Sequence, residues 1–135
     1  MFGFYRDIYI YVPRHDRRTF VTKVDFATAV PPEPSRGQGR KPYRVVSNLG
    51  VFWFVPGKGL EVESLHSGVA IDDVRDATSF PVISGGGRIT SPPTTTDLDF
   101  IREVIDPLGA RDLEFMDSRS RRDLIRTIYA KERLS

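Results

Sequence analysis

The sequence contains no cysteine, which excludes disulfides, thiolate nucleophiles and cysteine-ligated metal sites from this chain. No apolar run approaches the length of a membrane span, and charges appear early, at Arg6 and Asp7, where a signal peptide would have its apolar core. There are only two histidines, and no regular carboxylate spacing surrounds them, so a metal site is not expected. These absences favour a cytoplasmic protein without a membrane partner.

The formal net charge is only +2, which is too small to indicate a polyanionic partner. It is unevenly placed: both ends of the chain are basic and the middle is acidic. We interpret this pattern as a solvated surface and keep nucleic-acid binding through the basic ends as a weaker alternative. A length of 135 residues suits one domain and is short for two.

The stretch from Tyr43 to Phe80 organises the rest of the chain. Its first part is rich in β-branched and aromatic side chains, which predicts a strand buried on both faces. Gly50 interrupts this strand, either as a bulge or as a point of close backbone approach. A Pro-Gly turn at 56–59 and a return strand over 60–65 complete a predicted hairpin.

Alternation along the first of these strands predicts which side chains face the core. Phe52 and Phe54 fall on one side of the strand and Trp53 on the other. Residues 69–78 then predict a short helix with apolar positions on a single side. We therefore expect this helix to pack against one face of a sheet.

The remaining N-terminal segments are simpler. Residues 6–12 alternate and are rich in Ile and Tyr, which predicts a strand that Pro13 ends. Residues 19–27 predict either a short helical turn or a second extended piece. A basic loop rich in proline and glycine occupies 30–42, and a short strand is predicted over 80–83.

The C-terminal part is predicted to be largely helical. Thr94 and Asp97 have the spacing of a capping box and predict the start of a helix. Residues 112–116 are expected to be extended. A basic amphipathic helix closes the chain, with Ser120 and Asp123 as its expected cap, and it is expected to pack on its own domain or on a partner subunit.

Several blocks of sequence share an order and a spacing that together are specific. They read VVSNLGVFWF from Val45, LHSGV from Leu65, DVRDATSF from Asp73, PPT from Pro92 and IDPLG from Ile105. This series resembles the β subunit of class I coenzyme A transferases, and it is similar above all to the glutaconate CoA-transferase branch, which includes steroid ring-opening hydrolases. The resemblance runs from about Asp7 to Leu113.

The resemblance implies an α/β fold: the C-terminal half of a CoA-transferase β-subunit-like (NagB/RpiA/CoA transferase-like) sheet flanked by helices. It implies a partial β-subunit domain over 1–116, followed by the basic helix over 117–135. Acting with an α subunit, the complete enzyme would transfer CoA between carboxylic acids or hydrolyse a CoA-linked ring. The CoA thioester would be its substrate, and no permanently bound cofactor is expected.

The family's catalytic parts are not found in this sequence. In the family a glutamate attacks the acyl-CoA from a Ser-Glu-Asn/His-Gly type motif, beside a glycine-rich oxyanion turn. Neither motif occurs here, so no catalytic residue is assigned and the isolated chain is expected to be inactive. His15 and Asn48 are the two residues nominated as substrate-adjacent.

The absence of the glutamate motif and of the oxyanion turn also predicts which partners the chain binds. The chain is expected to bind a CoA-transferase α subunit or the N-terminal half of a β subunit, or to self-associate. The alternative reading is a non-catalytic interaction module related to CoA transferases.

Overall fold

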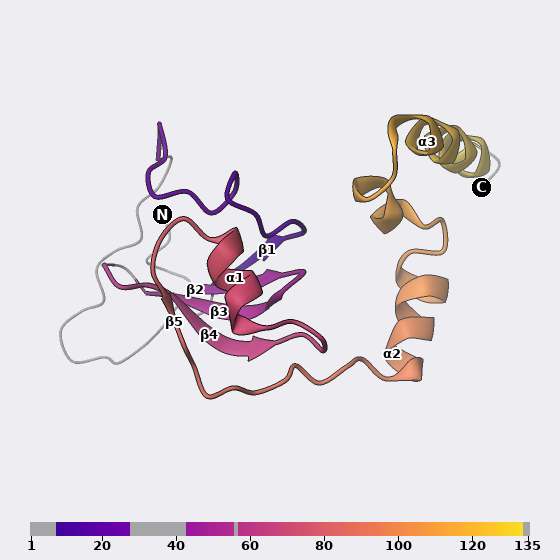
Figure 1. The fold of residues 1–135 in the computed structure, drawn as a ribbon. Helices are drawn as coiled ribbons and strands as arrows, with labels where there is room; N and C mark the ends of the chain where they lie inside the picture. The colour runs from indigo at the N-terminus through magenta and orange to yellow at the C-terminus, as the bar shows by residue number, and fades with distance from the viewer. Residues whose placement is uncertain (1–7, 28–42, 56, 134–135) are drawn as a thin grey trace. The chain divides into compact units, whose positions relative to one another are not determined.

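The computed structural model describes residues 8–27, 43–55 and 57–133. The chain divides into two compact units, Met1–Ser91 and Pro92–Ser135 (Figure 1). Among the described residues, the first unit contains a β-sheet and one helix, whereas the second is helical. The boundary predicted from the sequence lies further along, at the start of the C-terminal helix. The predicted basic loop at 30–42 lies outside the described residues.

The first unit is built on a five-stranded mixed sheet whose spatial order follows the order of the chain. Its strands are β1 (Ile8–Val12), β2 (Tyr43–Ser47), β3 (Gly50–Val55), β4 (Gly59–Leu65) and β5 (Val82–Ile83). β1 is parallel to β2 and β4 is parallel to β5, while β2, β3 and β4 form an antiparallel meander. Every described strand except β3 therefore runs in one direction. The sheet and its helix confirm the expected α/β class.

The predicted single strand around Gly50 is in fact two strands, so that prediction is wrong. The chain reverses at Asn48 and Leu49, and Val45 pairs with Phe52 across the resulting hairpin. The Ser47 hydroxyl accepts a hydrogen bond from the Leu49 amide at 3.2 Å, which supplies the local bond that a serine-containing turn needs. Gly50 itself does mark a close approach, because a Cβ there would collide with the Ser64 carbonyl oxygen.

The core lies on one face of this sheet, beneath α1 (Ile71–Ala77) (Figure 1). The helix begins where Asp73 accepts a hydrogen bond from the Ala70 amide at 2.7 Å. Val74 on the helix, Phe52 on β3 and Leu60 on β4 are all fully buried in one cluster. We call this side of the sheet the α1 face.

The opposite side of the sheet, called here the Trp53 face, carries Trp53 only partly buried. The predicted opposition of Phe52 and Trp53 is therefore confirmed. The pairing between β3 and β4 shifts register beside Phe52, so that Glu63 is an extra residue on β4. Its carboxylate forms an ion pair with Arg44, with 2.8 Å between Nε and Oε2. The Arg44 guanidinium also lies 4.2 Å from the centre of the Trp53 ring.

The second unit consists of short helices followed by one longer helix. They are α2 (Thr95–Asp99), the π-helical η2 (Phe100–Ile105), the 3-10 helix η3 (Ala110–Glu114) and α3 (Ser118–Glu132). None of its described residues is buried, and η2 exposes Phe100, Val104 and Ile105 by more than half of their surface. In the part of the chain that the structure describes, no helix is both long and apolar enough to cross a membrane.

Two sequence predictions for this unit are corrected and one is confirmed. The capping box is present, since Thr94 and Asp97 exchange side-chain and backbone hydrogen bonds. The extended piece at 112–116 is wrong, because most of that segment belongs to η3. The cap of α3 is Asp117 and not Ser120, since the Asp117 carboxylate accepts hydrogen bonds from the amides of Arg119 and Ser120.

Candidate functional site

Polar side chains gather where the parallel strands of the first unit end. His15 follows the end of β1, Asn48 follows β2, and His66 follows β4. In open α/β sheets, ligands bind at the carboxyl ends of the strands, so this edge is the place to look for a site. Both residues nominated from the sequence lie here, and the structure joins them: the His15 amide donates a hydrogen bond to Asn48 Oδ1 at 2.7 Å.

The His15 imidazole is buried, with 6% of the residue exposed. Its Nδ1 lies 2.9 Å from the Ser47 hydroxyl and its Nε2 lies 2.9 Å from the Thr78 hydroxyl. The ring stacks on Phe20 at 3.7 Å between centroids, and Phe52 meets it edge-on at 5.2 Å. Both ring nitrogens are therefore hydrogen-bonded within the protein, and two aromatic rings pack against the imidazole.

The hydrogen-bond network identifies the imidazole tautomer. Thr78 donates its single hydroxyl proton to the Val74 carbonyl at 2.7 Å, so it accepts from His15 Nε2–H. Nδ1 is then the unprotonated nitrogen and accepts from the Ser47 hydroxyl, whose oxygen is free to accept the Leu49 amide proton. Every donor in this hydrogen-bond network has an acceptor when His15 is neutral. A proton on Nδ1 would occupy the position of the Ser47 hydroxyl proton between the two atoms.

Burial also favours the neutral form of the His15 imidazole. It lowers the pKa of His15 from 6.5 to about 4, because removal from water disfavours the imidazolium, while the neighbouring Asp16 carboxylate acts weakly in the opposite direction. His15 is accordingly neutral at physiological pH. It joins the end of β1 to the turn after β2 and to the end of α1.

Ser47 and Thr78 are members of this cluster that the sequence analysis missed. Their only sequence signal is that each is a hydroxyl residue at the end of a strand or helix. The Ser47–His15–Thr78 arrangement is not a hydrolytic triad, since its third member is a hydroxyl and not a carboxylate. Ser47 is also only 3% exposed, which keeps its oxygen away from any substrate. The network therefore holds the strand ends in place and does not act as a nucleophile.

Asn48 and His66 are the members that approach the surface. Asn48 is exposed, and its Oδ1 accepts the hydrogen bond from the His15 amide, which leaves the two N–H bonds of its side chain as further donors. His66 is partly buried; its Nε2 donates to the Ser47 carbonyl at 2.9 Å and its amide donates to the Leu49 carbonyl at 3.0 Å. The turn that carries Asn48 is thus held from both sides by histidines.

The carboxylate next to His15 is that of Asp16, and its Oδ1 accepts hydrogen bonds from the amides of Arg18 and Thr19. Glu63 is ion-paired with Arg44 on the Trp53 face, and no group of three or more histidine and carboxylate side chains is suitably placed for a metal in the described ranges. What the edge offers chemically is a neutral amide donor on a rigid turn. Such a group can orient a ligand, but it cannot attack one.

Comparison with known proteins identifies several of similar sequence. No protein-family profile matches the chain. The cholesterol ring-cleaving hydrolase IpdB subunit of Mycobacterium tuberculosis H37Rv is 43% identical over 111 residues, and that of Rhodococcus jostii RHA1 is 40% identical over 111 residues. Each match covers 77% of this chain and 44% of the relative, so the chain spans less than half the length of these relatives.

The chain also resembles solved structures of related proteins. The chain resembles the crystal structure of Rhodococcus jostii RHA1 IpdAB with a TM-score of 0.60 and 39% identity, over 77% of this chain and 45% of that one. It resembles the decarboxylase AibA/AibB with a TM-score of 0.65 and 30% identity, over 79% of this chain and 41% of that one. These likenesses confirm the family that the ordered sequence blocks indicate. The chain therefore matches part of the IpdB-type β subunits, which together with AibA/AibB belong to the class I coenzyme A transferase family.

Proposed function

We propose that this chain is the sheet-bearing part of a β subunit that acts, together with an α-type subunit, on CoA thioesters. The observation that carries the proposal is the 43% identity to an IpdB subunit, a level at which fold and subunit role are ordinarily shared. The CoA thioester is the substrate of the complete enzyme, and no permanently held cofactor is needed. A cytoplasmic location is part of this proposal and accords with the lack of cysteine.

The reaction that the relatives favour is hydrolysis of a CoA-linked ring. The same fold serves a ring-cleaving hydrolase and a decarboxylase, so fold alone does not select the chemistry. In the comparison with solved structures, identity is 39% to IpdAB and 30% to AibA/AibB, which supports hydrolysis over decarboxylation. We therefore rank ring hydrolysis above CoA transfer between carboxylic acids.

Within this function, Asn48 is proposed to contact the substrate and His15 to position Asn48. The exposed amide of Asn48 lies at the carboxyl edge of the sheet, and the His15 backbone fixes its oxygen at 2.7 Å. The reacting carboxylate has to come from elsewhere in the assembly, because the sequence has no Ser-Glu-Asn/His-Gly type motif. This chain by itself is therefore proposed to be catalytically silent.

A non-catalytic interaction module remains the second candidate, and one observation favours it. The second unit buries none of its described residues, and its exposed apolar side chains include Phe100, Val104 and Ile105. A soluble monomer rarely leaves such groups together in water. Association through this unit is compatible with either function.

A graft tests the catalytic proposal. The matched part of the Rhodococcus jostii IpdB subunit is replaced by this chain, and the hybrid is co-expressed with the other subunit of IpdAB. We expect a co-eluting complex that hydrolyses the ring-bearing CoA thioester. Asn48→Ala should lower the rate, whereas Lys58→Ala, an exposed residue at the opposite end of the strands, should not. A hybrid that assembles but hydrolyses nothing would refute the proposed function.

A further inference from the structure

Two histidines bind the turn that follows β2, and they bind different parts of it. His66 supplies two hydrogen bonds: its amide donates to the Leu49 carbonyl at 3.0 Å, and its Nε2 donates to the Ser47 carbonyl at 2.9 Å. From its main chain, His15 supplies one, to Asn48 Oδ1 at 2.7 Å. His66 therefore fixes the carbonyl groups of the residues on either side of Asn48, whereas His15 fixes the side-chain oxygen.

The bond to the Ser47 carbonyl bears on the direction of the Asn48 side chain. That carbonyl lies in the peptide plane that leads into Asn48, and because the plane is rigid, fixing the C=O group also fixes the N–Cα bond of Asn48. The His15 ring does not act in this way, since its two nitrogens bond the hydroxyl groups of Ser47 and Thr78. His66 orients the backbone at Asn48 through its side chain.

His66 can serve as a rigid anchor because β4 is held on both sides where it ends. Leu65 pairs with Gly50 of β3 on one side. On the other side, the Leu65 amide donates to the Arg88 carbonyl at 2.9 Å. Gly50 permits the close approach of β3 to β4, since a Cβ there would collide with the Ser64 carbonyl oxygen. The His66 ring thus extends from a fixed strand end, across the start of β3, to the end of β2.

The two ring nitrogens of His66 have different surroundings. A carbonyl oxygen can only accept, so Nε2 carries the proton in the bond to Ser47. Nδ1 has no hydrogen-bond partner among the residues that the structure describes, and it is not enclosed there as an unsatisfied atom. A positioning role therefore depends on Nε2, whereas direct contact with a substrate would depend on Nδ1. Substitution can separate these two roles.

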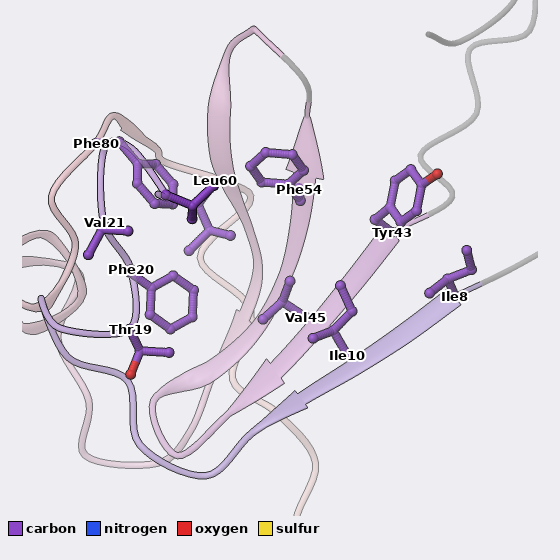
Figure 2. Close-up of a pocket in the computed structure, with 11 residues that line it drawn as sticks. Ile8, Ile10, Thr19, Phe20, Val21, Tyr43, Val45, Phe54, Leu60 and Phe80 are labelled. Carbon is purple, nitrogen blue, oxygen red and sulfur yellow. The ribbon is translucent and has the colours of Figure 1, made fainter. Parts of the chain in front are cut away.

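A cavity of about 390 Å³ on the α1 face is not part of this arrangement. Figure 2 shows Val45 of β2 and Phe54 of β3 projecting toward it, with Phe20 at its other side. The residues that line it do not include Asn48 or His66. Packing around the cavity therefore does not set the direction of the Asn48 side chain, which depends on the hydrogen bonds of the turn.

We propose that His66 is a positioning residue of the reaction: its amide and its Nε2 fix the carbonyls on either side of Asn48 and so hold the Asn48 side chain in the direction in which it meets the substrate. The inference rests on the proposed function, which assigns that contact to Asn48. Without the bond to Ser47, the Asn48 amide would sample several directions, and only a fraction of the molecules would present it correctly.

Three substitutions in the hybrid enzyme test the role of Nε2. His66→Ala removes the bond to the Ser47 carbonyl, and kcat/KM for the ring-bearing CoA thioester should fall by about tenfold. His66→Gln places an amide N–H close to the position of Nε2 and should keep kcat/KM within about threefold of the unsubstituted hybrid. His66→Asn places the amide at the position of Nδ1, out of reach of the Ser47 carbonyl, and should be as slow as His66→Ala.

A double substitution tests whether His66 acts through Asn48. His66→Ala should change the same kinetic parameter, kcat or KM, as Asn48→Ala, and it should have no further effect in a chain that already carries Asn48→Ala. Ser64→Ala is the matched control, because it removes a 2.8 Å hydrogen bond to Thr90 at the same end of β4 and should leave the rate unchanged. Urea unfolding of each variant chain verifies that it is folded.

NMR of the 135-residue chain alone gives a readout that needs no activity. The side-chain NH₂ signals of Asn48 should move toward those of a free asparagine in His66→Ala and in His66→Asn. They should keep their positions in His66→Gln, which retains a donor to the Ser47 carbonyl. A purely structural role of His66 elsewhere in the fold would not produce this difference between glutamine and asparagine.

The outcomes separate this inference from the proposed function. Full activity of His66→Asn would show that the reaction uses the Nδ1 position and would overturn the inference. Losses that multiply in the double variant, or Asn48 signals that are unchanged in His66→Ala, would show that His66 does not act through Asn48 and would also overturn it. An inactive unsubstituted hybrid would refute the proposed function, and the NMR result would still decide whether His66 fixes Asn48.

Discussion

The buried histidine makes the stability of this protein depend on pH in a calculable way. His15 is neutral in the folded chain because its pKa is lowered to about 4, whereas in the unfolded chain it titrates near 6.5. Between these two values the unfolded state binds a proton that the folded state does not. Stability is therefore fully present above pH 6.5, falls as the pH drops toward 4, and changes no further through this group below that.

The size of the effect follows from the difference in pKa. Each unit corresponds to about 1.4 kcal/mol, so the free energy of unfolding should fall by about 3 kcal/mol between pH 6.5 and pH 4. The carboxylates of Asp16, Asp97, Asp106 and Asp117 have pKa values lowered from 3.8 by their hydrogen bonds, so their stabilisation starts to be lost near pH 5 and is lost mainly below pH 4. The part of the window above about pH 5 therefore reports on His15.

The assay is urea unfolding of the chain at several pH values from 4 to 8. In His15→Gln the loss across the window should disappear, although this variant is less stable at pH 7 because Ser47 and Thr78 lose their buried partner. His66→Gln is the control and should keep the loss. Nitrogen-15 NMR should show His15 as the Nε2–H tautomer. The reasoning fails if His15→Gln retains the full pH dependence, or if Nδ1 carries the proton.

Three further predictions concern packing and chemistry. Phe52→Ala should lower the free energy of unfolding by roughly 3–5 kcal/mol, since the side chain is fully buried, while Trp53→Asp should cost about 1 kcal/mol through loss of the contact with Arg44; equal losses in urea melts would contradict the assigned faces. Gly85→Ala should destabilise the first unit, because a Cβ there would collide with the Val62 carbonyl oxygen; an unchanged melting temperature would show that the loop moves aside at no cost. The chain incubated with an acyl-CoA should yield no glutamyl-CoA thioester on borohydride or hydroxylamine trapping, and a trapped adduct would mean that one of its glutamates is the nucleophile.

Local sequence patterns predicted the local structure well. Alternation alone assigned Phe52 and Trp53 to opposite faces, and the three-residue spacing of Thr94 and Asp97 found a helix start. One error arose at Gly50, which was interpreted as a bulge or a close approach within one strand. The close approach is present, but the chain also reverses at Asn48 and Leu49, where the Ser47 hydroxyl accepts the Leu49 amide.

The environment of His15 could not be predicted in the same way. Its partners Asn48, Ser47 and Thr78 lie 33, 32 and 63 residues away along the chain. No local pattern encodes contacts at that range; they exist only once β1 lies beside β2 and α1 lies over the sheet. The family resemblance nominated His15 and Asn48 as substrate-adjacent, but no sequence pattern indicated the burial of the imidazole or the contributions of Ser47 and Thr78.

The meander of β2, β3 and β4 also has a consequence for how the chain folds. These three strands occupy residues 43–65 and are joined by short turns, whereas β1 is separated from β2 by residues 13–42. Closing the longer loop costs more entropy, so the meander should form in the folding transition state and β1 should join afterwards. Conservative substitutions at Val62 should then slow folding with φ-values well above those at Ile10, where mainly unfolding should accelerate. In the native state the same hierarchy predicts that β1 detaches before β2, β3 or β4.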